Sequence, residues 1–184
     1  MHELHQVTTT LTATLPDTFG YVLLAAVLLA LEVLVIGFAF PGKVRGQVFT
    51  EEFLKNNFGE QHKEATGEDI PKGGYPDSGS GLYSQKLTYK QWFDFNNAQR
   101  AHYNFVEMMP STLVFLLVGG IYFPVPSAVI GLVTAISRAI YSYGYANSGP
   151  KGRLLGAILN DLCLLGLLGL SVASAVMFTL GKAI

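Results

Sequence analysis

Residues Phe19 to Phe40 read FGYVLLAAVLLALEVLVIGFAF and contain one charged side chain, Glu32. A helix needs roughly 20 apolar residues to cross a hydrocarbon core of about 30 Å, so this run is long enough to span a bilayer. A secretory signal peptide is the alternative. However, no Lys or Arg precedes the run, and it exceeds the roughly 7–15 apolar residues of such a peptide. The sequence therefore predicts a retained membrane helix that ends at Pro41-Gly42.

Three further apolar segments follow, and clusters of Pro and Gly separate them. Phe123-Pro124-Val125-Pro126 predicts one tight turn, and the residues from Asn147 to Gly152 predict a short loop. Small residues in the last segment, among them Gly156 and Gly166, allow close contact between helices. We expect an all-α integral membrane protein, a four-transmembrane-helix bundle forming a single domain over residues 1–184. Its expected spans cover about 19–40, 97–122, 127–146 and 153–180.

The composition agrees with this class and excludes several others. The chain has 184 residues, of which 50% are hydrophobic and only 14% are charged, and its formal net charge is -1. Soluble domains carry about 25% charged residues, so disorder, a basic nucleic-acid binder and a charged coiled coil fit poorly. The single cysteine excludes an internal disulfide and a thiolate metal cluster.

The long polar loop at 42–95 carries most of the charges and indicates the orientation of the helices. It holds seven Lys and Arg residues, the third connection adds Lys151 and Arg153, and the second connection has none. The positive-inside rule therefore places the first and third loops in the cytoplasm, with Lys182 as the exception. Within the loop, residues 49–58 predict a short helix. The aromatic run from Tyr83 to Phe95 predicts either a membrane-interface belt or a small cap packed on the bundle.

Polar side chains form two stripes inside the predicted spans. Arg100, Asn104 and Glu107 are spaced i, i+4, i+7, and Arg138, Tyr141 and Tyr145 are spaced i, i+3, i+7. Each spacing aligns its residues on one helical face. Charged residues in membrane segments usually face a bundle interior or an aqueous cavity. In the expected topology both stripes lie at the cytoplasmic ends of their helices, at the same level as Arg45 and Arg153.

This set of side chains suits a small zwitterionic ligand with more than one carboxylate. Arginine binds carboxylates through two parallel hydrogen bonds, Glu107 can accept an ammonium, and Asn104 can pair with a peptide group. Each residue also has a structural explanation. Arg100 and Glu107 could form an ion pair that fixes helix register. The two tyrosines could belong to the interfacial belt, and Arg45 and Arg153 could anchor lipid headgroups.

Other polar positions are less informative. Glu32 and Asp161 lie deeper in their spans and could be proton or ion sites, neutral acids or interhelical hydrogen-bonding groups, and we favour hydrogen bonding. We expect His102 to make an interhelical contact and Cys163 to pack as a small apolar side chain. His2, His5 and His62 are too scattered to predict a metal site.

Two motifs resemble those of the MAPEG family, the membrane-associated proteins in eicosanoid and glutathione metabolism. Arg100-Ala-His-Tyr-Asn104-Phe-Val-Glu107 is similar to its R-x-H-x-N-x-x-E motif, and the segment from Arg138 to Tyr145 is similar to its third-helix motif. Gly42-Lys43-Val44-Arg45 is similar to a segment in the microsomal glutathione transferase branch. The leukotriene-synthase branch has a tyrosine after the glutamate, where this chain has Met108.

The resemblance implies a four-helix protomer in a homotrimer, with glutathione bound between neighbouring protomers near the cytoplasmic face. Carried over by position, six residues would contact glutathione, and Arg45 would reach it from an adjacent protomer. Arg153 is the expected thiolate-activating residue, although it lies one position later than in the leukotriene-synthase branch, with Lys151 as the alternative. The six expected contact residues are Arg100, Asn104, Glu107, Arg138, Tyr141 and Tyr145.

The expected function is a membrane-bound glutathione transferase with glutathione peroxidase activity, in which glutathione is the co-substrate and no metal is needed. A free thiol with a pKa of about 8.5 is mostly protonated at pH 7, and a nearby arginine favours the thiolate. The thiolate could then attack a lipophilic electrophile or reduce a lipid hydroperoxide. The alternatives are leukotriene C4 synthase-like conjugation, a non-catalytic lipid-binding scaffold, and a small transporter that uses Glu32 and Asp161. We expect the endoplasmic reticulum membrane, with the outer mitochondrial membrane as the alternative.

Overall fold

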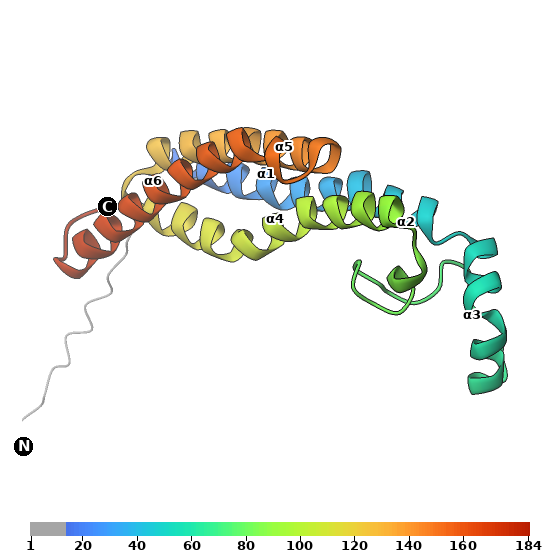
Figure 1. The fold of residues 1–184 in the computed structure, drawn as a ribbon. Coiled ribbons are helices and arrows are strands. Elements are labelled where there is room, and N and C mark those ends of the chain that lie inside the picture. The colour runs from blue at the N-terminus through green and yellow to red at the C-terminus, as the bar shows by residue number, and fades with distance from the viewer. Residues whose placement is uncertain (1–13) are drawn as a thin grey trace, which may run out of the picture.

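The computed structural model describes residues 14–184. The first 13 residues of the predicted domain, including His2, His5 and most of the N-terminal tail, lie outside this part of the chain. Four long helices run side by side in an antiparallel bundle, and a smaller helical region stands at one end (Figure 1). The elements are α1 (Phe19–Gly37), a π-helical turn (Phe38–Gly42), α2 (Lys43–Val48), α3 (Glu51–Thr66), a 3₁₀ turn (Ser84–Lys86), α4 (Tyr89–Tyr122), α5 (Pro124–Gly152) and α6 (Leu154–Thr179).

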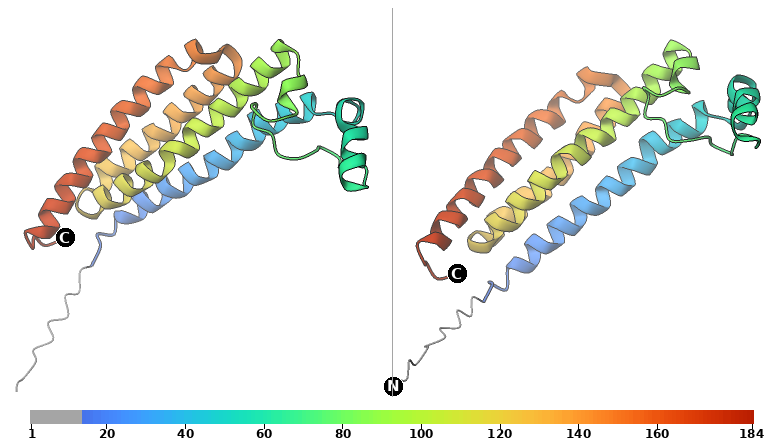
Figure 2. Two further views of the ribbon diagram at one scale, coloured as in Figure 1. Left: turned by 60° about the horizontal axis from the view of Figure 1, so that its bottom comes forward. Right: turned by 90° about the horizontal axis from the view of Figure 1, so that it is seen from below.

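The four predicted spans are confirmed as helices that are long and apolar enough to cross a membrane. Large apolar side chains such as Leu24, Val133 and Leu162 are exposed on the outside of the bundle. Exposing such an apolar surface to water would cost free energy, whereas contact with lipid tails does not. Both termini of the described chain lie at one end of the bundle (Figure 2). There the hydroxyl of Tyr122 donates a hydrogen bond of 2.7 Å to the carbonyl of Lys182.

The predicted end of the first helix at Pro41-Gly42 is wrong. The helix continues as one unit from Phe19 to Val48, because a π-helical turn contains Pro41. Proline has no N–H group and its ring crowds the carbonyl four residues earlier, and the wider π turn accommodates both effects. This continuation carries Arg45 beyond the apolar part of the helix, on α2.

The other boundaries differ by a few residues for local reasons. The second long helix begins at Tyr89 rather than near 97, because Thr88 and Gln91 form a reciprocal capping box. The predicted helix at 49–58 extends from Glu51 to Thr66, and Gly67 ends it in the left-handed conformation. The turn before α5 consists of Phe123 alone, since Pro124 already occupies the first helical position.

Part of the aromatic run from Tyr83 to Phe95 belongs to a small cap packed beside the bundle, while an interface belt stays a prediction for its exposed rings. Rings of Phe49, Phe58, Tyr83 and Phe95 are buried together in a second hydrophobic core beside the bundle. Phe49 packs edge-on against Phe95 with ring centroids 5.3 Å apart. Tyr89, in contrast, is largely exposed. This aromatic core joins α3 and the following loop to the end of the bundle that carries the first and third connections.

Candidate functional site

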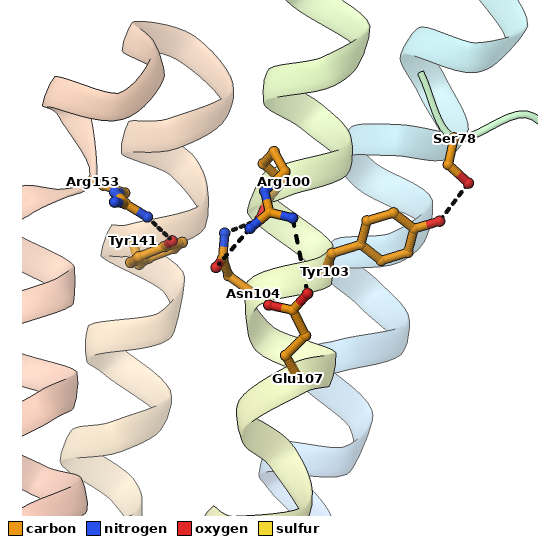
Figure 3. Close-up of polar contacts among 7 residues, drawn as sticks. All are labelled: Ser78, Arg100, Tyr103, Asn104, Glu107, Tyr141 and Arg153. Carbon is orange, nitrogen blue, oxygen red and sulfur yellow. Dashed lines mark hydrogen bonds and ion pairs between the residues drawn. The ribbon is translucent and has the colours of Figure 1, made fainter. Parts of the chain in front are cut away.

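Arg153 and Tyr141 form the best-defined polar contact among the predicted site residues. Nη1 of Arg153 donates a hydrogen bond of 2.9 Å to the phenolic oxygen of Tyr141 (Figure 3). The guanidinium carbon of Arg153 also lies 5.4 Å from the ring centroid of Tyr145, within the range of a cation–π interaction. The two rings are adjacent, with centroids 5.9 Å apart. The sequence-predicted grouping of these three residues is therefore present in the structure.

The backbone at the junction of α5 and α6 determines where Arg153 lies. Gly149 has a φ of 64° and interrupts the helix just before Pro150, a conformation that only glycine adopts readily. The chain then turns back, and Arg153 precedes the first residue of α6. Gly156 lies so close to α5 that a Cβ there would overlap the backbone of Tyr141. This close approach allows a residue at the start of α6 to reach a phenol on α5.

The other predicted stripe lies along α4. Nδ2 of Asn104 donates to the carbonyl of Arg100 at 2.8 Å, and Nη2 of Arg100 donates to Oδ1 of Asn104 at 3.4 Å. Arg100 and Glu107 form an ion pair at 3.9 Å, with 42% and 60% of their side chains exposed. Figure 3 shows the three side chains close together on one face. The long distance and the exposure leave both charged groups accessible to a ligand. This pair is therefore not a buried ion pair that fixes the helix register.

Arg138 is buried together with the two tyrosines of its stripe, Tyr141 and Tyr145. It is only 2% exposed, and its guanidinium carbon lies 4.5 Å from the ring centroids of both Phe105 and Tyr141. A direct contact between Arg138 and glutathione stays a prediction. The contacts present in this protomer are with Phe105 and Tyr141, and Tyr141 also accepts the hydrogen bond from Arg153.

Arg45 is held by the loop that follows α3. Its guanidinium donates to the carbonyl oxygens of Gly73 at 2.9 Å, Tyr75 at 2.7 Å and Asp77 at 3.1 Å. A contact with glutathione from a neighbouring protomer stays a prediction. The three carbonyls take three of the five N–H donors of Arg45. Arg45 also lines a polar pocket of about 370 Å³ together with Asp77, Gln99 and Tyr103.

Asp77 organises this loop, and the sequence analysis did not single it out. Its buried carboxylate accepts hydrogen bonds from the amides of Gly79 (2.9 Å), Gly81 (3.1 Å) and Ser84 (2.9 Å), and from the hydroxyl of Ser84 (2.5 Å). Burial by itself would raise the pKa of Asp77, but these hydrogen bonds outweigh it and hold the pKa below its ordinary value of 3.8. The Asp-Ser-Gly sequence at 77–79 is a known turn signal that could have identified it.

Two aromatic residues of α4 attach the same loop to the bundle. The hydroxyl of Tyr103 lies 2.6 Å from that of Ser78, and Nε1 of Trp92 donates to the carbonyl of Gly79 at 2.8 Å. In Figure 3 Tyr103 points away from the Arg100 stripe and towards the loop. The predicted interhelical role of His102 is also present, since its Nε2 packs against Gly37 of α1. Cys163 is buried, as predicted.

Within the described protomer the predicted residues thus form three separate groups. Arg138, Tyr141, Tyr145 and Arg153 lie together at the α5–α6 end, Arg100, Asn104 and Glu107 share a face of α4, and Arg45 is engaged by the loop. In residues 14–184 no hydrogen bond or ion pair joins one group to another.

Fold and polar groups together define a class of protein: an integral membrane protein of four helices with a cationic, tyrosine-rich site near one end of the bundle. Comparison with protein families identifies the class further. The model of the MAPEG family matches residues 18–173, which covers all four long helices up to the last turns of α6. The chain belongs to the MAPEG family. This family includes glutathione transferases, peroxidases and leukotriene synthases, and some of its members are non-catalytic.

Proposed function

We propose that this protein is a membrane-bound glutathione transferase that also reduces lipid hydroperoxides, similar to microsomal glutathione S-transferase 3. The observation that carries the proposal is the hydrogen bond from Arg153 to Tyr141, beside the ring of Tyr145. It holds a permanent cation at a fixed place near the end of the bundle. A cation held in a fixed position stabilises an anion more than a mobile one does, because little reorganisation is needed.

In this proposal the α4 stripe binds glutathione and Arg153 acts on its sulfur. Arg100 pairs with a carboxylate, Glu107 accepts the ammonium and Asn104 pairs with a peptide group. Arg138 and Tyr145 complete the site around Tyr141, and Arg45 contributes from a neighbouring protomer. Each unit by which Arg153 lowers the thiol pKa corresponds to about 1.4 kcal/mol of preferential stabilisation of the thiolate.

Both reactions balance without a metal. In conjugation, the thiol releases its proton to water, and the thiolate forms a carbon–sulfur bond to an electrophilic carbon. The carbon either loses a leaving group as an anion or, in an activated double bond, passes the π electrons to a neighbouring carbon that takes up a proton from water. In reduction, the thiolate attacks the terminal oxygen of a hydroperoxide and the O–O bond breaks, giving a sulfenic acid and a lipid alkoxide. The alkoxide takes up the proton released by the thiol and becomes the alcohol. A second glutathione then forms the disulfide and releases water. The apolar co-substrate would enter laterally from the bilayer.

A homotrimer is part of the proposal. Arg100 and Glu107 are exposed on the outside of the single protomer, as is Asp161 on α6. Charged groups on a lipid-facing surface are costly, so neighbouring copies that cover these faces would remove this cost. The same packing would bring the three separate groups of site residues closer. Membership of the family, whose members use glutathione and lipophilic substrates in membranes, supports these two classes of ligand for the site.

Leukotriene C4 synthase-like conjugation and a non-catalytic lipid-binding scaffold are the alternatives. The methionine at position 108, where the leukotriene synthase branch has tyrosine, argues against identical lipid chemistry. The ordered Arg153–Tyr141 contact argues against a scaffold, which would not need it. We further propose an endoplasmic reticulum location, with the first and third loops in the cytoplasm, and the outer mitochondrial membrane as the alternative.

The test is glutathione binding and turnover by the purified full-length protein in detergent or nanodiscs. A model aromatic electrophile and a fatty-acid hydroperoxide are compared side by side, and the bound thiolate is followed by its ultraviolet absorbance. We expect glutathione binding, a thiolate signal near neutral pH and turnover of both substrates. Binding without a thiolate signal or turnover would favour the scaffold. Absence of glutathione binding would exclude the transferase, the peroxidase and the leukotriene C4 synthase-like functions.

A further inference from the structure

One line of side chains on α4 faces α5 near the end of the bundle that carries the predicted site. Its members are spaced four residues apart, which places them on one side of the helix. Asn97, Ala101 and Phe105 are buried, and Phe93, one turn earlier, is 38% exposed. Asn97 is thus the single polar residue of this line.

The inner part of the line packs α4 directly against α5. The ring centroid of Phe105 lies 4.5 Å from the guanidinium carbon of Arg138. One turn earlier on α4, the carbonyl of Ala101 accepts a hydrogen bond of 3.4 Å from the hydroxyl of Ser142. Ala101 also shares a buried cluster with Tyr141. The line therefore faces the helix that carries the tyrosines of the proposed site.

The outer part of the line reaches the junction of α5 and α6. A Cβ added to Gly149 would lie 3.4 Å from Nδ2 and 3.6 Å from Oδ1 of Asn97, and 3.5 Å from Cζ of Phe93. Gly149 is buried, and it is the residue at which the backbone leaves the helical conformation. Asn97 and Phe93 therefore cover the point at which the chain turns towards Arg153.

Arg153 lies between two close contacts of this kind. Gly149, four residues earlier, lies beside Asn97, and Gly156, three residues later, lies against the backbone of Tyr141. The first contact exists because the capping box begins α4 at Tyr89, ahead of its apolar part. The position of Arg153 thus depends on α4 as well as on its own helix.

We propose that Asn97 is a positioning residue for Arg153: it packs on Gly149, fixes the junction of α5 and α6, and so holds the guanidinium at the reacting sulfur. The effect on rate rests on the proposed glutathione chemistry, whereas the packing at the junction does not. Asn97 links the helix that binds glutathione in this proposal to the residue that activates its thiol. Its loss should therefore change the chemical step more than the binding of glutathione.

The test compares Asn97→Ala with Asn96→Ala, the same change at the neighbouring residue, which lies beside Gly79 of the loop instead. In the ligand-free protein we expect N97A to increase hydrogen exchange at the amides of residues 151–157 roughly tenfold. The pKa of bound glutathione, followed by thiolate absorbance against pH, should rise, and kcat for conjugation should fall about tenfold. The Kd for glutathione should change less than about threefold. N96A should leave the exchange at 151–157 and the thiolate pKa as in the wild-type protein.

The proposal is overturned if exchange at 151–157 is unchanged in N97A, or if it rises equally in N96A. Faster exchange with an unchanged thiolate pKa also overturns it, because Asn97 would then only stabilise the fold. If N97A does not fold, Phe93→Leu takes its place, since it withdraws the ring tip from Gly149 at a partly exposed position and should change exchange and thiolate pKa in the same direction. If the wild-type protein binds no glutathione, the proposed function fails, while the exchange comparison still decides whether Asn97 fixes the junction.

Discussion

Arg153 and Tyr141 are joined by a 2.9 Å hydrogen bond in which the guanidinium is the donor and the phenol is the acceptor. The phenol oxygen therefore accepts a hydrogen bond from Arg153, and its own O–H group stays free to donate. This arrangement leaves four N–H groups of Arg153 for a bound anion. The pair thus combines a fixed cation with a free hydroxyl donor, both of which can stabilise a thiolate.

Removing the two partners separately should have unequal effects. Arg153→Leu removes the cation, so we expect the thiolate absorbance of bound glutathione to disappear and turnover to fall more than tenfold. Tyr141→Phe keeps the ring beneath Arg153 and removes one hydrogen bond of about 1 kcal/mol, so turnover should fall roughly fivefold. Stopped-flow absorbance and steady-state assays measure both. If R153L retains the thiolate signal, Lys151 becomes the candidate and is tested in the same way.

Glu107 should determine the affinity for glutathione rather than the rate of the chemical step. Glu107→Gln removes a charged hydrogen bond worth about 1.5–3 kcal/mol, so the Kd for glutathione should rise roughly ten- to a hundredfold. Isothermal titration calorimetry with glutathione, and with an analogue that lacks the amino group, measures this loss. Glu64→Gln, an exposed change on α3, is the matched control. Equal losses of affinity for both ligands would show that Glu107 does not bind the ammonium.

Asp77 should make the ordering of its loop depend on pH. Because the pKa of Asp77 is lower in the folded protein than the ordinary 3.8, its stabilisation is complete above that value and is lost as the pH falls through the folded pKa. Hydrogen-exchange protection at residues 77–84 should therefore persist at pH 7 and fall progressively below about pH 3.8, as the pH approaches the lower pKa of the folded state.

Asp77→Asn should lose this protection already at pH 7, since an amide offers one oxygen where the carboxylate offers two. The local cost should be about 1–3 kcal/mol, as for other buried donors left without an acceptor. Asp69→Asn is the control, because Asp69 makes only an exposed ion pair with Lys63. Protection that is equal in D77N and the wild-type protein would contradict the role given to these hydrogen bonds.

Gly156 and Gly169 lie on the same helix and should respond differently to alanine. A Cβ at Gly156 would overlap the backbone of Tyr141, whereas one at Gly169 has open space. We expect Gly156→Ala to destabilise the protein by about 1–3 kcal/mol and to weaken the Arg153–Tyr141 contact. Gly169→Ala should be neutral or stabilising by up to about 1 kcal/mol. Thermal unfolding in detergent compares the two, and similar melting temperatures would contradict the close packing.

The orientation of the bundle can be tested with glycosylation acceptors. The Phe123 turn lies at the same end as the C-terminus, and the positive-inside rule places that end outside the cytoplasm. A short flexible insert carrying an acceptor site at this turn should be glycosylated in microsomes. The same insert between Gly67 and Pro71 should stay unmodified. The reverse pattern would invert the topology proposed for the first and third loops.

Much of the fold follows from the sequence because lipid imposes a simple rule. Inside a bilayer the backbone N–H and C=O groups must form hydrogen bonds within the protein, because no water is present. A single apolar run such as Phe19–Phe40 achieves this as a helix. The i, i+4, i+7 spacing then places Arg100, Asn104 and Glu107 on one face of whichever helix contains them. These statements depend only on local geometry, and the structure contains both features.

Contacts between side chains from distant segments depend on tertiary packing and do not follow from the sequence pattern. Nothing in the spacing of Arg138 shows that Phe105 and Tyr141 enclose it, or that Arg45 is held by carbonyls about thirty positions away. The cap of α3 and its loop likewise depends on rings from distant segments that share one core. The sequence by itself determined four membrane helices and two polar stripes, because helix geometry and the cost of charge in lipid act locally. Only the tertiary structure decided which charge faces which partner, because that depends on how closely the helices pack, as at Gly156.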